Sequence, residues 1–145
     1  MNFKMFLASM LGALCITTSA VAADNSADAP KKIVITLHSH NISSAGFGLA
    51  VANAMQDAGV QSTVFVAADA VDYALVSTKQ GKFGASMPKD MISSLIKKGG
   101  KVMICEGFVK MRGIKPSEMV KGVEVATPGD LAGALFAPNA QSMTF

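Results

Sequence analysis

The chain has 145 residues, of which 50% are hydrophobic and 16% are charged, and its formal net charge is +3. This composition excludes an intrinsically disordered chain, because disorder requires low hydrophobicity and a high net charge. The length fits one domain with enough apolar residues for a packed core.

The N-terminus is typical of a secretory signal peptide. A short basic start precedes an uncharged, mostly apolar run over residues 5–19, and small residues follow it. The run is shorter than the roughly 20 residues of a spanning helix, and Cys15 lacks the flanking residues of a lipoprotein signal. We therefore expect residues 1–23 to be removed on export to the periplasm, leaving a flexible polar leader over residues 24–30.

The charge of the mature chain argues against a nucleic-acid partner. Cleavage after Ala23 removes one lysine and no acidic residue, which leaves a net charge of +2. The lysines are spread along the chain from Lys31 to Lys121, and there is only one arginine. Nucleic-acid binding requires a concentrated basic stripe, which this pattern does not provide.

The region after the leader, residues 31–145, alternates between strand and helix patterns. A β-branched run at residues 31–37 is typical of a strand buried on both faces. Helical spacing begins at Ser44, where Ser43 or Ser44 is suited to cap the start and Gly59 to close the end. The side chains expected to form the buried face of this helix are Phe47, Val51, Met55 and Ala58.

The same alternation continues to the C-terminus. Further strands are expected at residues 63–66, 101–105, 123–126 and 142–145, and helical segments at residues 69–75, 86–96, 107–111 and 127–135. Residues 77–85 are polar and contain two glycines, so we expect an exposed loop there. Five strands separated by helices predict a doubly wound α/β fold, with a mainly parallel sheet covered on both faces.

Ligands of such sheets bind beyond the carboxyl ends of the strands. His38 and His40, the only histidines, directly follow the strand at residues 31–37, and Cys105 ends the strand at residues 101–105. If the strand order is the common 2-1-3 arrangement, these two strands are neighbours and the thiol lies near an imidazole.

Cys105 is the only cysteine of the mature chain. A lone thiol in an exported protein is buried and inert, links two chains, or is kept for its chemistry. A nearby imidazole, or the free N–H groups of the helix expected near Gly107, would stabilise the nucleophilic thiolate, and Glu106 would oppose this effect if it pointed inward. We expect a reactive thiol.

The His-Ser-His sequence allows more than one interpretation. On an extended segment His38 and His40 point the same way, and with Cys105 and a methionine such as Met111 they would offer the ligands of a copper site. The commoner outcome is a polar loop in which one histidine bonds to the backbone.

Two further features are ambiguous on sequence alone. Residues 43–48, Ser-Ser-Ala-Gly-Phe-Gly, suit either an anion at a helix start or close packing of a helix on the sheet. Arg112, the only arginine, is suited to pair with a carboxylate or with an anionic group in the crevice, and an ordinary solvated side chain is the alternative.

Residues 102–114 resemble the DsrE/DsrF-like family of small sulfur-relay proteins. The shared pattern is an apolar strand that ends in Cys105, a short helix, and Arg112-Gly113 followed by an aliphatic residue. The likeness covers nearly all of the mature chain and implies a flavodoxin-like subunit that forms dimers, trimers or hexamers. It also implies that Cys105 accepts sulfur as a persulfide and passes it to a partner thiol. Phe108 stands where many members have a second cysteine, so a two-cysteine mechanism is not expected.

The first hypothesis is therefore a periplasmic sulfur carrier, transferase-like if active, in which Cys105 reacts and no cofactor is needed. The residues expected to assist binding are His38, His40, Gly107 and Arg112. The expected partners are further copies of the chain and a sulfur donor or acceptor protein, with no membrane association after signal cleavage. The alternatives are a noncatalytic metal- or small-ligand-binding module that uses His38, His40 and Cys105, and an oligomer whose thiol is inert.

Overall fold

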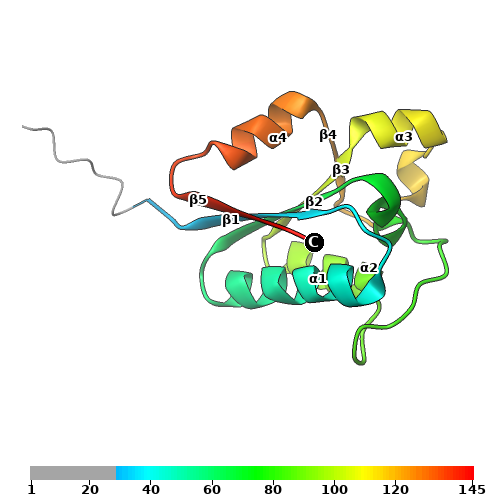
Figure 1. Ribbon diagram of the computed structural model, residues 1–145, viewed down its shortest axis with the longest axis horizontal. Helices are drawn as coiled ribbons and strands as arrows, with labels where there is room; N and C mark the ends of the chain where they lie inside the picture. The colour runs from blue at the N-terminus through cyan, green and yellow to red at the C-terminus, as the bar shows by residue number, and fades with distance from the viewer. Residues whose placement is uncertain (1–28) are drawn as a thin grey trace, which may run out of the picture.

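The computed structural model describes residues 29–145 as a five-stranded parallel sheet with helices around it (Figure 1). The strands are β1 (Lys32–Leu37), β2 (Gln61–Val66), β3 (Lys101–Cys105), β4 (Glu124–Ala126) and β5 (Ala140–Thr144). All neighbouring strands pair in parallel, which confirms the predicted fold class. The predicted signal peptide and most of the predicted leader lie outside the described residues.

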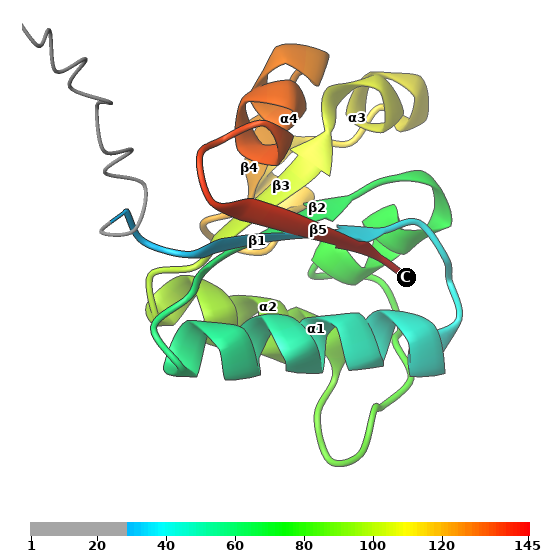
Figure 2. The ribbon, with the colours of Figure 1, turned by 60° about the vertical axis from the view of Figure 1, so that its left-hand side comes forward.

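The helical segments connect these strands. They are α1 (Ile42–Asp57), η2 (Ala68–Ala74), α2 (Pro88–Lys97), α3 (Glu106–Arg112), η3 (Pro116–Glu118) and α4 (Pro128–Leu135), of which η2 and η3 are 3-10 helices. Helices α1 and α2 lie side by side under one face of the sheet, α4 lies over the other face, and α3 extends from the end of β3 (Figures 1 and 2). Among residues 29–145, no helix has the length and hydrophobicity needed to cross a bilayer.

The strand order is β4-β3-β2-β1-β5, so β2 separates β1 from β3. The 2-1-3 arrangement considered from the sequence is therefore wrong. Each of the first three crossovers moves one strand further in the same direction, and only the crossover through α4 returns to the other side of β1. Right-handed crossovers in opposite directions place their helices on opposite faces, which explains why α4 lies across the sheet from α1 and α2.

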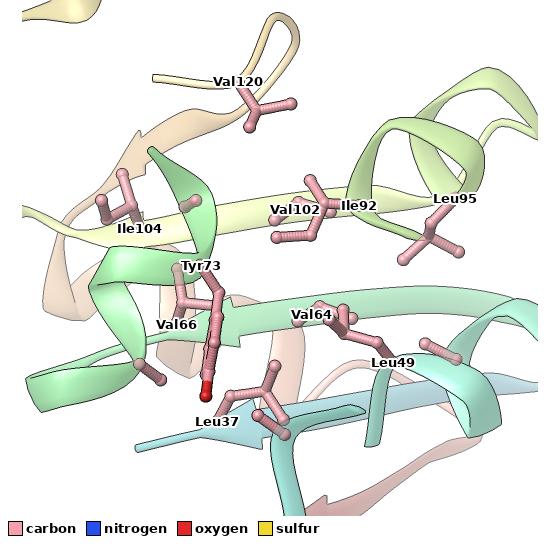
Figure 3. Packing of buried hydrophobic residues seen from close by; sticks show 14 of the residues in the cluster. Leu37, Leu49, Val64, Val66, Tyr73, Ile92, Leu95, Val102, Ile104 and Val120 are labelled. Carbon is pink, nitrogen blue, oxygen red and sulfur yellow. The ribbon is translucent and has the colours of Figure 1, made fainter. Parts of the chain in front are cut away.

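Most of the core lies between the sheet and the helices α1 and α2 (Figure 3). The strands contribute Leu37, Val64, Val66, Val102 and Ile104, and the helices contribute Leu49, Ile92 and Leu95, all with 0% exposure. The opposite face carries a much smaller cluster of Phe65, Met103 and Ala126, against which Leu131 and Ala134 of α4 pack. The sheet is therefore held mainly from one side.

Helix α1 buries a different face from the one predicted. Its buried residues are Ala45, Gly46, Gly48, Leu49 and Ala52. Phe47 and Met55, which were expected inside, are 52% and 38% exposed. Small side chains let the helix axis lie close to the sheet, so the larger side chains are left on the outside. The cap also differs, since the Asn41 side chain accepts hydrogen bonds from the backbone N–H groups of Ser43 and Ser44.

Close packing explains the glycines at residues 43–48. A Cβ atom at Gly46 would lie 2.3 Å from Cγ of Phe83, and one at Gly48 would lie 2.7 Å from Cδ2 of Leu37. Both glycines lie inside α1 rather than in a loop before it. The structure therefore supports the packing interpretation of this motif over the anion-binding one.

The segment at residues 77–85 lacks regular structure, as predicted, but it is tied to the fold at two points. Phe83 is half-buried against Gly46. The Gln80 side-chain amide donates to the carbonyl oxygens of Asp72, Tyr73 and Leu75, and its oxygen accepts from the N–H of Lys89. These contacts fix the segment between η2 and the start of α2.

Substituting Gly46 tests this close approach. We expect Gly46→Ala to lower the free energy of unfolding by about 1–3 kcal/mol, because the new methyl group overlaps the Phe83 ring. The matched control is Gly133→Ala in α4, where a Cβ atom meets nothing within 4 Å. The control should be neutral or stabilising by up to about 1 kcal/mol, since alanine is the better helix former. Equal effects of the two changes in chemical denaturation would contradict the packing argument.

Candidate functional site

Cys105 is the last residue of β3 and the N-cap of α3, with extended backbone angles and a half-buried side chain. It packs at the border of the small cluster around Phe65 and Met103. Its Sγ atom would lie 3.8 Å from a Cβ atom at Gly107, so the sulfur sits over the first turn of α3. The free N–H groups of a helix start favour negative charge at this position.

Glu106, the residue expected to oppose a thiolate, is engaged elsewhere. Its Oε1 atom lies 2.6 Å from Nζ of Lys110, one turn further along α3. This ion pair draws the carboxylate along the helix and offsets its charge. The local field at Cys105 is therefore less negative than the sequence alone indicates.

A second group of polar side chains forms beside the carboxyl edge of the sheet. One Asp72 oxygen lies 2.5 Å from the Arg112 guanidinium and the other lies 3.6 Å from Nε2 of His40. Asp72 is on η2, Arg112 ends α3, and His40 lies between β1 and α1. This carboxylate therefore ties the C-terminal end of the helix that begins after Cys105 to the loop after β1.

Tyr73 completes this group. Its hydroxyl donates to the carbonyl oxygen of His40 at 2.7 Å, and the two rings stack with centroids 5.3 Å apart. The pKa of Tyr73 is raised, first by burial of the phenol and second by the negative charge of Asp72. Both effects penalise the phenolate, so the hydroxyl stays a hydrogen-bond donor in the neutral range.

The sequence-predicted residues thus do not come together at one site. Arg112 pairs with a carboxylate, which was one of its two predicted partners. Gly107 lies beside Cys105, whereas His40 lies with Asp72 and Tyr73. The side chain of His38 is exposed, and its N–H donates to the carbonyl of Phe145.

The structure does not assemble the alternative metal site of His38, His40 and Cys105. Strand β2 lies between the strands that precede these residues. Within residues 29–145, no three His, Cys, Asp or Glu side chains lie close enough together to hold a metal ion. Metal binding by this set of residues is therefore not supported.

The sequence analysis missed Asp72 and Tyr73. They occupy adjacent positions in a short helical pattern that matches no catalytic or binding motif. Their one available signal was that Tyr73 is the only tyrosine of the chain, which by itself carries no function. Only the strand order shows that η2 reaches both His40 and Arg112.

The C-terminal residue extends the pairing of β5 with β1 at the carboxyl edge of the sheet. Phe145 donates its N–H to the Thr36 carbonyl and accepts from the N–H of His38. Its ring contacts Phe47 edge-to-face, with centroids 5.6 Å apart. The end of the chain therefore lies against α1 at the carboxyl end of β1.

Comparison with known proteins identifies the family. The model of the DsrE/DsrF-like family matches residues 31–141. The solved structure of the YchN protein from E. coli is 22% identical, with a TM-score of 0.69, over 81% of this chain and all of its own. The protein of unknown function MTH1491 from Methanobacterium thermoautotrophicum is 14% identical, with a TM-score of 0.64, over 79% of this chain and 99% of its own. At these identities the two structures show a shared fold, and no curated protein matches the chain.

The single tyrosine allows a direct test of the group around Asp72. We expect Asp72→Asn to lower the pKa of Tyr73, because the negative charge that disfavours the phenolate is removed. The pKa should stay above its ordinary value, since burial is the larger cause. Ultraviolet titration of the phenolate measures this without interference, because the chain has no tryptophan.

The matched control for this titration is Asp69→Asn, an exposed acidic residue on the same 3-10 helix. It removes the same charge from the chain without touching the contacts of Asp72 with Arg112 and His40. We expect the tyrosine titration to stay unchanged in this variant. A tyrosine pKa that responds equally to both changes would contradict the assigned contact.

Proposed function

The chain belongs to the DsrE/DsrF-like family, and from this premise we propose that it is an exported sulfur carrier that uses Cys105. Family membership suggests a function of the sulfur-relay type. The observation that carries the proposal is the position of the only mature thiol, half-buried at the end of β3 and at the start of α3. This is the position of the cysteine in the family pattern.

The proposed reaction is a transfer of sulfane sulfur without a cofactor. The Cys105 thiolate attacks the terminal sulfur of a persulfide or polysulfide donor, and the donor leaves as its own thiolate. The product is a persulfide on Cys105. A thiolate of an acceptor protein then attacks the outer sulfur, the bond to Sγ breaks, and Cys105 leaves as a thiolate. Electrons balance in each exchange, so no oxidant is required.

The residues around Cys105 support this chemistry. Gly107 lets a bound sulfur approach the backbone of the first helical turn, because it is exposed and has no side chain of its own. The ion pair of Glu106 with Lys110 reduces repulsion of an incoming anion. Phe108 replaces the second cysteine of many members, so the outer sulfur has no neighbouring thiol within α3 and passes to another molecule.

We further propose that the carrier works in the periplasm. Residues 1–23 have the pattern of a signal peptide. In that compartment thiols are exposed to oxidants, so the acceptor requires a cysteine that is kept reduced or regenerated there. His38, exposed at the end of β1, is our proposed contact for such an acceptor.

We also propose a homo-oligomer that forms through the free edge of β5. Phe47 and Met143 are 52% and 43% exposed. Among residues 29–145, strand β5 pairs only with β1, so within this part of the chain its other side offers unpaired backbone groups. An exposed strand edge beside large apolar side chains is a surface that a second copy would cover.

Persulfide formation is testable by intact mass. We expect the mature chain, residues 24–145, to gain the mass of one sulfur atom on incubation with inorganic polysulfide, because Cys105 is its only thiol. Cys105→Ser should show no gain. A reductant should remove the added sulfur, since a persulfide is reducible.

A displaced thiol serves as the control for position. Ser117→Cys, made in the Cys105→Ser background, puts an exposed thiol on η3. We expect it to react about tenfold more slowly near neutral pH, because it lacks the strand-end position before a helix start. Equal rates would mean that any exposed thiol takes up the sulfur, which would contradict a built carrier site.

Sedimentation velocity tests the oligomer. We expect the mature chain to sediment as a species larger than a monomer, and the double variant Phe47→Ser/Met143→Ser to dissociate, because it removes the large apolar side chains at the β5 edge. Phe136→Ser is the control, since Phe136 is 86% exposed at the end of α4. Dissociation in the control alone would assign the interface to α4 instead.

A further inference from the structure

The fold gathers the excess positive charge of the chain at one edge of the sheet. In a parallel sheet all strands start at the same edge, and the helices that return to it end there. Six of the lysines among residues 29–145 lie at these starts and ends, and we call them the basic edge. They are Lys31, Lys32, Lys97, Lys98, Lys101 and Lys121.

Few acidic residues offset this edge. Asp57, at the end of α1, pairs with Lys98 at 2.8 Å, and Glu124, at the start of β4, pairs with Lys101 at 2.9 Å. The remaining basic and acidic residues of the described chain are equal in number, with six of each. The six lysines, less Asp57 and Glu124, therefore give the edge a net charge of +4. Subtracting Asp24 and Asp28, which precede the described residues, leaves +2, which equals the net charge of the whole mature chain.

Helix stabilisation explains only part of the basic edge. Lys97 and Lys98 lie at the C-terminal end of α2, where the helix dipole favours a positive charge. Lys31 and Lys121 are exposed and lie outside any helix. A purely structural role therefore does not account for the whole edge.

The basic edge also has an apolar cavity. Its volume is about 550 Å³, and Ile33, Met55 and Val60 form apolar parts of its wall, with Lys31 and Lys32 also lining it. Ala29, the first described residue, contributes to the lining too. Lysines beside an apolar cavity are suited to bind a partner whose surface is anionic and whose interior is apolar.

From this juxtaposition we propose that the basic edge docks on an anionic phospholipid membrane surface. The lysines contact headgroup phosphates, and the apolar cavity faces the acyl boundary. Cys105, at the opposite edge of the sheet, then points away from the lipid and stays open to a protein partner. This proposal departs from the expectation of no membrane association after signal cleavage, because lysines that are scattered in the sequence are gathered at one edge by the fold. It is independent of the sulfur chemistry.

The test uses the mature chain, residues 24–145, and vesicle co-sedimentation. We expect binding to phosphatidylglycerol vesicles and not to phosphatidylcholine vesicles, with loss of binding as salt shortens the screening length to about 8 Å near 0.15 M. Each lysine near an anionic surface is worth roughly a fivefold change in affinity. We therefore expect Lys31→Gln/Lys97→Gln/Lys121→Gln to bind at least tenfold more weakly.

A second triple variant controls for net charge. Lys79→Gln/Lys82→Gln/Lys115→Gln removes the same charge from exposed positions away from the basic edge, and we expect it to bind within about twofold of the parent chain. An equal loss of vesicle binding in both triple variants would overturn the proposal, and so would the absence of a preference for phosphatidylglycerol. Binding to an acidic protein without binding to lipid would also overturn it. Cys105→Ser should bind vesicles like the parent, which separates this result from the sulfur-transfer test.

Discussion

The common direction of the five strands is the constraint on which the molecule depends. Because all neighbouring strands pair in parallel, each connection must cross the sheet and return, and every residue outside the strands is assigned to one of two edges. Cys105 falls at the carboxyl edge because β3 ends there, and the same rule places the starts of β1, β3 and β4 at the opposite edge with most of the lysines. Reactivity and charge are thereby separated by the length of the strands.

The close packing of α1 makes this arrangement possible. Two buried glycines and two buried alanines let the helix approach Leu37 and the C-terminal Phe145, and Gly46 receives the ring of Phe83 from a distant segment. The consequence is that Phe47 is exposed on the outer surface of α1 near β5, whereas Met55 is exposed at the cavity of the basic edge. Close packing by small side chains thus leaves large apolar side chains outside, and we assign the surface around Phe47 to self-association.

The sequence was sufficient for the elements whose signals are local. The strand at residues 101–105 and the helix that Thr127 caps were predicted at their observed positions, because a β-branched run or a capping residue acts within a few residues. The buried face of α1 was predicted wrongly, since the pattern follows large apolar side chains and gives no weight to glycine. The neighbours of β1 could not be predicted from the sequence either, because hydrophobic periodicity identifies strands but not their order in the sheet. For the same reason the contact of Asp72 with His40 and Arg112 had no signal in the sequence.

The way in which α3 is held bears on how Cys105 can act. None of the seven residues of this helix is buried, and only partial contacts of Phe108 and Val109 attach it to the main core. Its far end is fixed by the pairing of Arg112 with Asp72 and by Gly113, whose left-handed backbone ends the helix. A helix held mainly at its far end leaves Gly107, in its first turn, exposed. A carrier requires this geometry, because its sulfur must be held firmly and yet be reached by a second protein.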